Sequence, residues 1–169
     1  MTAIEKNAVK EQILSTLVSE LKSEFSTDLR AVVLYGSMVD QTKSTTDFDV
    51  FVIVEKSLGT RPDRIDLMLK IENRLGSELR SAALIGCHWE ISLKLKTLQE
   101  SDHFSPLYLD WVDRSRILYE DESTAATKII HKTAEWIFTS GAKKYQRGLL
   151  WYWDLMPDLK PGEERKIGW

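Results

Sequence analysis

A glycine–serine pair and two closely spaced aspartates are the residues of this sequence best suited to chemistry. Gly36 and Ser37 follow an apolar run, and nine residues separate Ser37 from the first member of the pair Asp47 and Asp49. A glycine at the end of a strand allows a ligand to approach the backbone closely. A serine that begins a helical turn lies among free backbone N–H groups, which suit a phosphate.

The two aspartates predict a site for a hard cation. Because Asp47 and Asp49 are two positions apart, they project from the same face of a strand, roughly 6–7 Å apart. Two carboxylates at this separation repel each other unless a cation neutralises them, so we expect them to bind Mg²⁺. Lys43 lies in the polar stretch before them. It could help to bind phosphate, or it could be a solvated loop lysine.

A triphosphate near Ser37 and Mg²⁺ at the aspartates would together serve the transfer of a nucleotidyl group. One metal ion would lower the pKa of an attacking hydroxyl, and a second would stabilise the departing pyrophosphate. A third carboxylate, Glu90, lies on the polar side of an alternating segment further along the chain. It is a candidate ligand for the same ions, or else a surface carboxylate paired with Lys94.

These residues resemble the signature of the DNA polymerase β-like nucleotidyltransferase superfamily, especially its small prokaryotic minimal nucleotidyltransferases. In that family Gly-Ser at a strand–helix turn precedes Asp-x-Asp on the next strand, and a third carboxylate lies on a later strand. Gly36, Ser37, Asp47 and Asp49 match the pattern by position, with Glu90 as the third carboxylate. The resemblance covers the sequence from the first expected strand to the third.

The resemblance implies a fold, a reaction and a role for each residue. The implied fold is α/β, a mixed twisted sheet with helices mainly on one face and the other face open around the carboxylates. The implied reaction is Mg²⁺-dependent transfer of AMP from ATP to a hydroxyl of a protein or small molecule. Gly36 and Ser37 would hold the phosphates, Asp47 and Asp49 would bind two Mg²⁺ ions, and Glu90 would bind one ion and act as base.

A departure from the family pattern keeps other functions open. Family members commonly carry an arginine shortly after the serine, whereas Met38 and Val39 stand there in this chain. One alternative is a weak or inactive nucleotidyltransferase fold that acts as an antitoxin and pairs with a HEPN-type toxin. Another is a domain that senses a metal ion or nucleotide without catalysis. The plainest alternative is a tight turn followed by two solvated aspartates.

Composition and charge restrict the class of protein. A length of 169 residues favours one domain, and a net charge of −3 argues against a dedicated duplex nucleic-acid binder, so no nucleic-acid partner is expected. The single Cys87 excludes an internal disulfide and a multi-cysteine zinc site. No apolar run approaches the roughly 20 residues of a membrane span. We expect a cytoplasmic protein without a membrane partner, and a homodimer stays open.

The spacing of apolar residues predicts the elements that must position these side chains. Helical spacing covers residues 4–25 and 62–79, and alternation predicts a half-solvated strand over 88–95, with His88 and Glu90 on its polar side. The other expected elements are strands over 29–35, 47–55 and 116–119, a short helix over 106–113 and a long helix over 123–146.

The expected organisation is a nucleotidyltransferase domain in residues 1–120, with a C-terminal helix and an aromatic, Pro/Gly-rich tail in residues 121–169. Trp151, Tyr152 and Trp153 could stack on a base. We favour packing of the tail on the domain, because exposed aromatic clusters promote aggregation.

Overall fold

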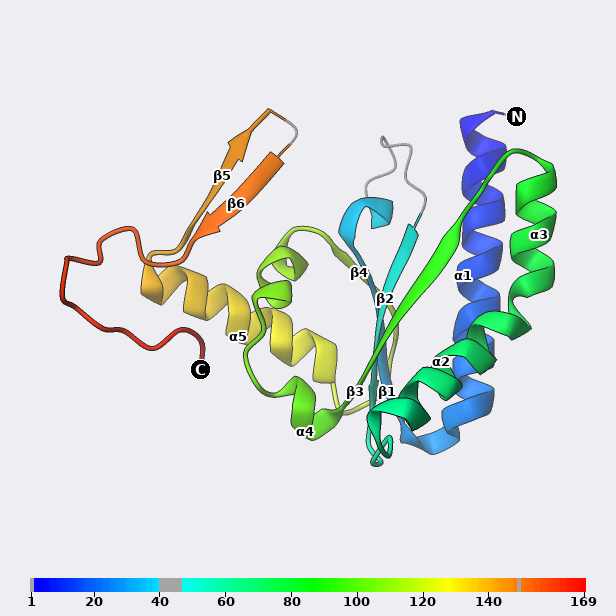
Figure 1. Cartoon of the computed structure of the whole chain (residues 1–169), viewed down its shortest axis with the longest axis horizontal. Coiled ribbons are helices and arrows are strands. Elements are labelled where there is room, and N and C mark those ends of the chain that lie inside the picture. The colour runs from blue at the N-terminus through cyan, green and yellow to red at the C-terminus, as the bar shows by residue number, and fades with distance from the viewer. Residues whose placement is uncertain (1, 40–46, 149) are drawn as a thin grey trace.

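A four-stranded mixed sheet forms the centre of the molecule (Figure 1). The computed structural model describes residues 2–39, 47–148 and 150–169. In spatial order the strands are β3 (Glu90–Thr97), β2 (Asp47–Val54), β1 (Leu29–Tyr35) and β4 (Ser115–Glu120). β1 runs antiparallel to both of its neighbours, whereas β2 and β3 are parallel. The α/β class and the mixed sheet predicted from the sequence are confirmed.

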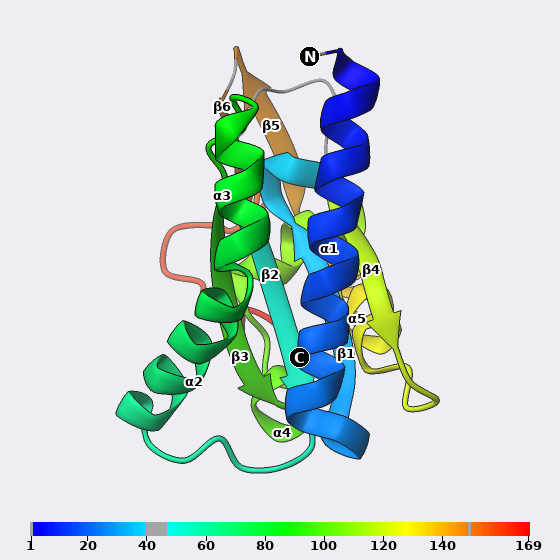
Figure 2. The same cartoon turned by 90° about the vertical axis from the view of Figure 1, so that its right-hand side faces the viewer.

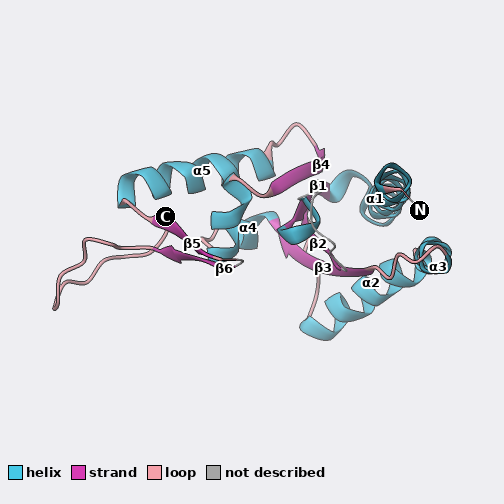
Figure 3. Ribbon diagram, turned by 90° about the horizontal axis from the view of Figure 1, so that it is seen from above, coloured by secondary structure: helices cyan, strands magenta, loops and turns pink. Residues whose placement is uncertain are grey.

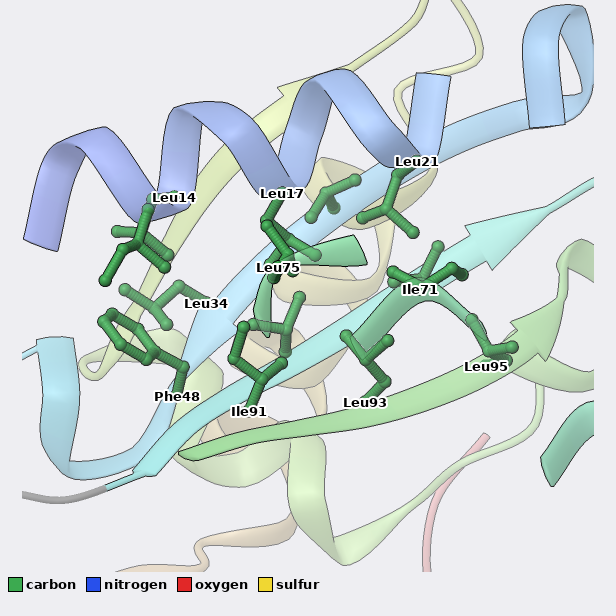
Figure 4. Close-up of a cluster of buried hydrophobic side chains, with 14 of the residues drawn as sticks. Leu14, Leu17, Leu21, Leu34, Phe48, Ile71, Leu75, Ile91, Leu93 and Leu95 are labelled. Atoms are coloured by element: carbon green, nitrogen blue, oxygen red, sulfur yellow. The ribbon is translucent and has the colours of Figure 1, made fainter. Parts of the chain in front are cut away.

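Three helices cover one face of the sheet (Figure 2): α1 (Ala3–Phe25), α2 (Arg61–Arg74) and α3 (Gly76–Leu84). α1 and α2 each begin with a capping box, in which a threonine and an acidic residue three positions later satisfy each other's backbone N–H groups. The side chains between these helices and the sheet form the main hydrophobic core (Figure 4). They include Leu14, Leu17, Leu21, Leu34, Phe48, Ile71, Leu75, Ile91, Leu93 and Leu95.

A second, smaller core lies on the opposite face, which was expected to be open around the carboxylates. Two short segments, α4 (Leu98–Ser101) and η3 (Pro106–Val112), lie on this side together with α5 (Ala125–Ser140) (Figure 3). Phe51 and Ile53 are buried there, although they share the strand face of Asp47 and Asp49. One end of this face is therefore closed by aromatic packing, and the end with the aspartates lies outside the buried cluster.

The chain after α5 differs from the long helix expected over residues 123–146. The helix ends at Ser140, because Gly141 adopts a left-handed conformation with φ of 72°. A hairpin of β5 (Lys143–Arg147) and β6 (Leu150–Asp154) follows. At the other end the helix begins at Ala125, and Ser123, where the helix was expected to begin, donates its hydroxyl to Asp121.

The hairpin is held to η3 by one carboxylate. The indole N–H groups of Trp151 and Trp153 both donate to Asp110, at 3.2 and 3.1 Å, and the Lys144 ammonium lies 2.8 Å from the same side chain. Arg114 lies over the Trp151 ring, 4.4 Å from its centroid. These two tryptophans therefore face the body of the protein, and Tyr152 between them is exposed.

Across the described residues, no helix combines the length and apolar character that a membrane crossing requires.

Candidate functional site

The glycine–serine pair lies in a single helical turn at the end of β1. Gly36 has φ of 76° and begins η2 (Gly36–Val39). A Cβ atom at this position would lie 2.7 Å from Oδ2 of Asp49. The glycine therefore serves two purposes, because it adopts a left-handed conformation and lets the turn approach the carboxylate. The two halves of the sequence motif meet at this contact.

The three predicted carboxylates lie on one face of two adjacent strands. Asp47 and Asp49 are at the beginning of β2, and Asp47 is the register partner of Glu90 in the parallel strand β3. Neighbouring strands are about 4.8 Å apart, and paired residues of parallel strands project to the same side. Asp47 and Glu90 are exposed, and Asp49 is partly buried. The register thus places Glu90 next to Asp47 on the neighbouring strand.

The surroundings of Asp49 raise the pKa of its carboxyl group above the ordinary value. Burial raises the pKa of Asp49, the neighbouring charge of Asp47 raises it further, and Lys94 partly opposes both effects. Tyr35 is the register partner of Asp49 on β1, and burial together with Asp49 raises its pKa to about 12. Hard oxygen ligands in a site that disfavours its own negative charge suit a divalent cation.

The carboxylates are not gathered into a finished ligand cluster. Within residues 2–39, 47–148 and 150–169, no three His, Cys, Asp or Glu side chains lie close enough together to hold a metal ion. Asp47, Asp49 and Glu90 share a face, and their joint coordination of an ion stays a prediction.

Of the other residues considered in the sequence, Lys43 lies outside the described residues. His88 precedes β3 and is exposed, and Cys87 is buried, with 4% of its surface accessible.

One residue beside the site was missed by the sequence analysis. Lys10, on α1, is only 6% exposed, and its ammonium donates a hydrogen bond of 2.5 Å to the carbonyl oxygen of Met38 in the turn. The signal was available, because Lys10 falls on the same helical stripe as Leu14 and Leu17. A lysine in an apolar stripe requires a polar partner, and here that partner is the turn.

A cavity of about 560 Å³ lies elsewhere in the molecule. Glu55, Leu98 and Lys128 are among the residues that line it, between the far end of β2, α4 and the beginning of α5. It is at the opposite end of β2 from Asp47, so the candidate site is not this cavity.

Comparisons with known proteins give similarities of structure. No protein-family model matches the chain, and no curated protein matches it. The chain is similar to a chain in a crystal structure of a toxin–antitoxin with AMP-PNP, with 18% identity over 75% of this chain and 91% of the other, at a TM-score of 0.44.

Two further solved structures are similar. One is the toxin–antitoxin MntA–HepT, with 14% identity over 78% of this chain and 92% of the other, at a TM-score of 0.44. The other is a tri-AMPylated Shewanella oneidensis HEPN toxin in complex with an MNT antitoxin, with 16% identity over 78% of this chain and 92% of the other, at a TM-score of 0.43.

Proposed function

We propose that this protein is a Mg²⁺-dependent nucleotidyltransferase that transfers AMP from ATP to a hydroxyl group. The observation that carries the proposal is the contact between the two halves of the motif. The turn at Gly36 lies directly against Asp49, at the end of the strands where Asp47 and Glu90 are register partners. A phosphate-binding turn next to hard-cation ligands is the juxtaposition that nucleotidyl transfer requires.

Each residue has a role in this proposal. The backbone of Gly36 and Ser37 would bind the β- and γ-phosphates, with Lys43 as a further phosphate ligand. Asp47 and Asp49 would hold Mg²⁺, which supplies Lewis-acid chemistry at the phosphates when bound. Glu90, which is exposed at the start of β3, would complete the ligand set and accept the proton of the acceptor hydroxyl.

The acceptor in this proposal is a protein or small-molecule hydroxyl. The sequence resemblance to minimal nucleotidyltransferases makes a HEPN-type toxin the first protein partner to test, with its tyrosine as the acceptor.

A second candidate is an antitoxin or binding module of the same fold without activity. Two observations favour it. Met38 and Val39 stand where the family commonly has a basic residue, and no three acidic side chains form a metal cluster within the described residues.

The first experiment measures thermal stability with ATP plus Mg²⁺ and with ATP plus EDTA. We expect a metal-dependent rise in Tm for the wild type, because ligand at about 100 times its Kd adds roughly 2.7 kcal/mol to stability. The Asp47→Asn/Asp49→Asn variant is expected to lose this rise. Asp66→Asn/Asp158→Asn, which changes two exposed aspartates away from the site, is the matched control and should retain it.

The two candidates separate on pyrophosphate release. An enzyme releases pyrophosphate from ATP when a hydroxyl acceptor is supplied, whereas a binding module gives the metal-dependent rise in Tm without release. A wild type that shows no rise with any of the four nucleoside triphosphates would overturn the nucleotidyltransferase proposal.

A further inference from the structure

Lys10 is a charged residue placed in the hydrophobic side of α1. Only 6% of its surface is exposed, and burial lowers the pKa of its ammonium below the ordinary lysine value. A buried charge is costly unless polar groups compensate for it. Its compensation is the hydrogen bond of 2.5 Å to the carbonyl oxygen of Met38. Lys10 therefore joins α1 to the turn that follows β1.

The charges around Lys10 do not form an ion pair with it in the described part of the chain. Glu11, its neighbour on α1, makes two hydrogen bonds of 2.8 Å with the guanidinium of Arg116 on β4. Glu11 raises the pKa of Lys10 and Arg116 lowers it, and burial outweighs both. Because Glu11 is paired with Arg116, the hydrogen bond to the Met38 carbonyl is the contact that holds the Lys10 ammonium behind the turn.

The direction of the backbone groups in the turn determines how the charge of Lys10 can act on a bound phosphate. In a helical turn the N–H groups point toward the beginning and the carbonyl groups toward the end. Lys10 binds a carbonyl near the end of η2, at the opposite end of the turn from the N–H groups of Gly36 and Ser37. A turn of this length spans about 6–8 Å. A phosphate at its beginning would therefore still lie within reach of the field of Lys10.

We propose that Lys10 is a positioning residue for the polyphosphate of a nucleoside triphosphate. It holds Met38 so that the turn presents its N–H groups outward, and it supplies positive charge in place of the basic residue missing after Ser37. This inference rests on the proposed function, since it assigns a role within the same nucleotide site.

The test compares the affinities of Lys10 variants for ATP and for AMP, both with Mg²⁺, by isothermal titration calorimetry. We expect Lys10→Met to weaken ATP binding by about tenfold or more, because the phosphates lose a nearby positive charge and the turn loses its anchor. AMP has no β- or γ-phosphate, so its affinity should change by less than about threefold. Lys10→Arg should restore most of the ATP affinity, because it keeps both charge and donors.

Two further variants make the test specific. Lys10→Gln keeps a donor for the Met38 carbonyl without the charge, so it should bind ATP with an affinity between those of Lys10→Met and the wild type. Lys6→Met removes an exposed lysine from the same helix and should behave as wild type. The unliganded Tm of each variant is measured alongside. If Lys10→Met does not fold, Lys10→Gln and Lys10→Arg decide the question.

The outcomes are distinct. A wild type that binds ATP, together with a Lys10→Met variant that binds it equally well, overturns the role of Lys10 and leaves the proposed function standing. Equal loss of ATP and AMP affinity also overturns the role, because a merely structural residue would affect both ligands alike. A wild type that binds no nucleotide overturns the proposed function and this inference together.

Discussion

Gly36 adopts a left-handed conformation and also lies against the Asp49 carboxylate, so its substitution should have two separable effects. Gly36→Ala places a Cβ in a left-handed conformation, at a cost of about 1 kcal/mol, and drives it against the Asp49 carboxylate 2.7 Å away. We expect a lower Tm together with the loss of the ATP-dependent rise in Tm. Differential scanning fluorimetry with and without Mg²⁺ and ATP measures both effects.

Gly141 provides the matched control for this substitution. Its φ of 72° is nearly the same as that of Gly36, but a Cβ there would meet nothing within 4 Å. Gly141→Ala should therefore lower the Tm through backbone strain alone and leave the ATP-dependent rise unchanged. If the two variants responded to ATP alike, Gly36 would have only a conformational role.

At the scale of elements, the β5–β6 hairpin depends on Asp110. Burial would raise the pKa of Asp110, but hydrogen bonds from Lys144, Trp153 and Trp151 outweigh it and leave that pKa lowered. Asp110→Ala removes the acceptor of two indole N–H groups and the partner of an ammonium. We expect a loss of about 1–3 kcal/mol in the stability of this region. Tryptophan fluorescence should shift to longer wavelength as the indoles gain access to water.

Asp113→Ala is the control for this prediction. The Asp113 side chain is 52% exposed and pairs with Lys144, whereas Asp110 accepts the hydrogen bonds from the two indoles. Its removal should change stability by under about 1 kcal/mol and leave the fluorescence maximum in place. A fluorescence shift of equal size in both variants would mean that Asp110 does not hold the hairpin specifically.

The elements that the sequence predicted best are those with long, continuous runs of apolar residues. β1 and β2 were identified nearly to the residue, because continuous apolar runs are typical of central strands. The hairpin was missed because β5 consists mainly of charged and polar residues, which continue the pattern of the preceding helix. The helix was expected to continue to residue 146, and the left-handed Gly141 that ends it was not recognised as a stop.

The sequence predicted which candidate residues share a face of one strand, but it did not predict which residues of different elements lie side by side. Spacing placed Asp47 and Asp49 on one face of β2, and alternation placed Glu90 on the polar side of β3. The one-to-one register of Asp47 with Glu90 depends on how β2 and β3 align, which no local pattern determines. The contact of Lys10 with the turn likewise joins residues 28 positions apart.

At the scale of the whole molecule, the ion pairs predict a defined loss of stability in acid. The hydrogen bond from Arg64 lowers the pKa of Glu100 to about 2, and the Arg116 hydrogen bond lowers that of Glu11. A carboxylate whose folded pKa is depressed stabilises the protein above its unfolded pKa. That contribution is lost as the pH falls through the folded value. The free energy of unfolding should therefore decline from about pH 5 toward about pH 2.

Urea unfolding of the wild type and Arg64→Gln at several pH values tests this assignment. At pH 7 the variant should be less stable by about 1 kcal/mol, a value limited by the partial exposure of the pair. The difference should shrink as the pH falls toward 2, because Glu100 becomes protonated in both proteins. A difference that stayed constant with pH would show that Arg64 acts through packing alone.

The order of the strands along the chain also predicts the order in which they pair during folding. β2 follows β1 after a short connection, whereas residues 36–114 separate β1 from β4 along the chain. Closing a longer loop costs more entropy and slows its formation, so we expect β4 to pair with β1 late in folding. The pair of Glu11 and Arg116, 105 positions apart, can form only at that stage. The turn beside the carboxylates would then acquire its final surroundings among the last events of folding, after most of the main core has formed.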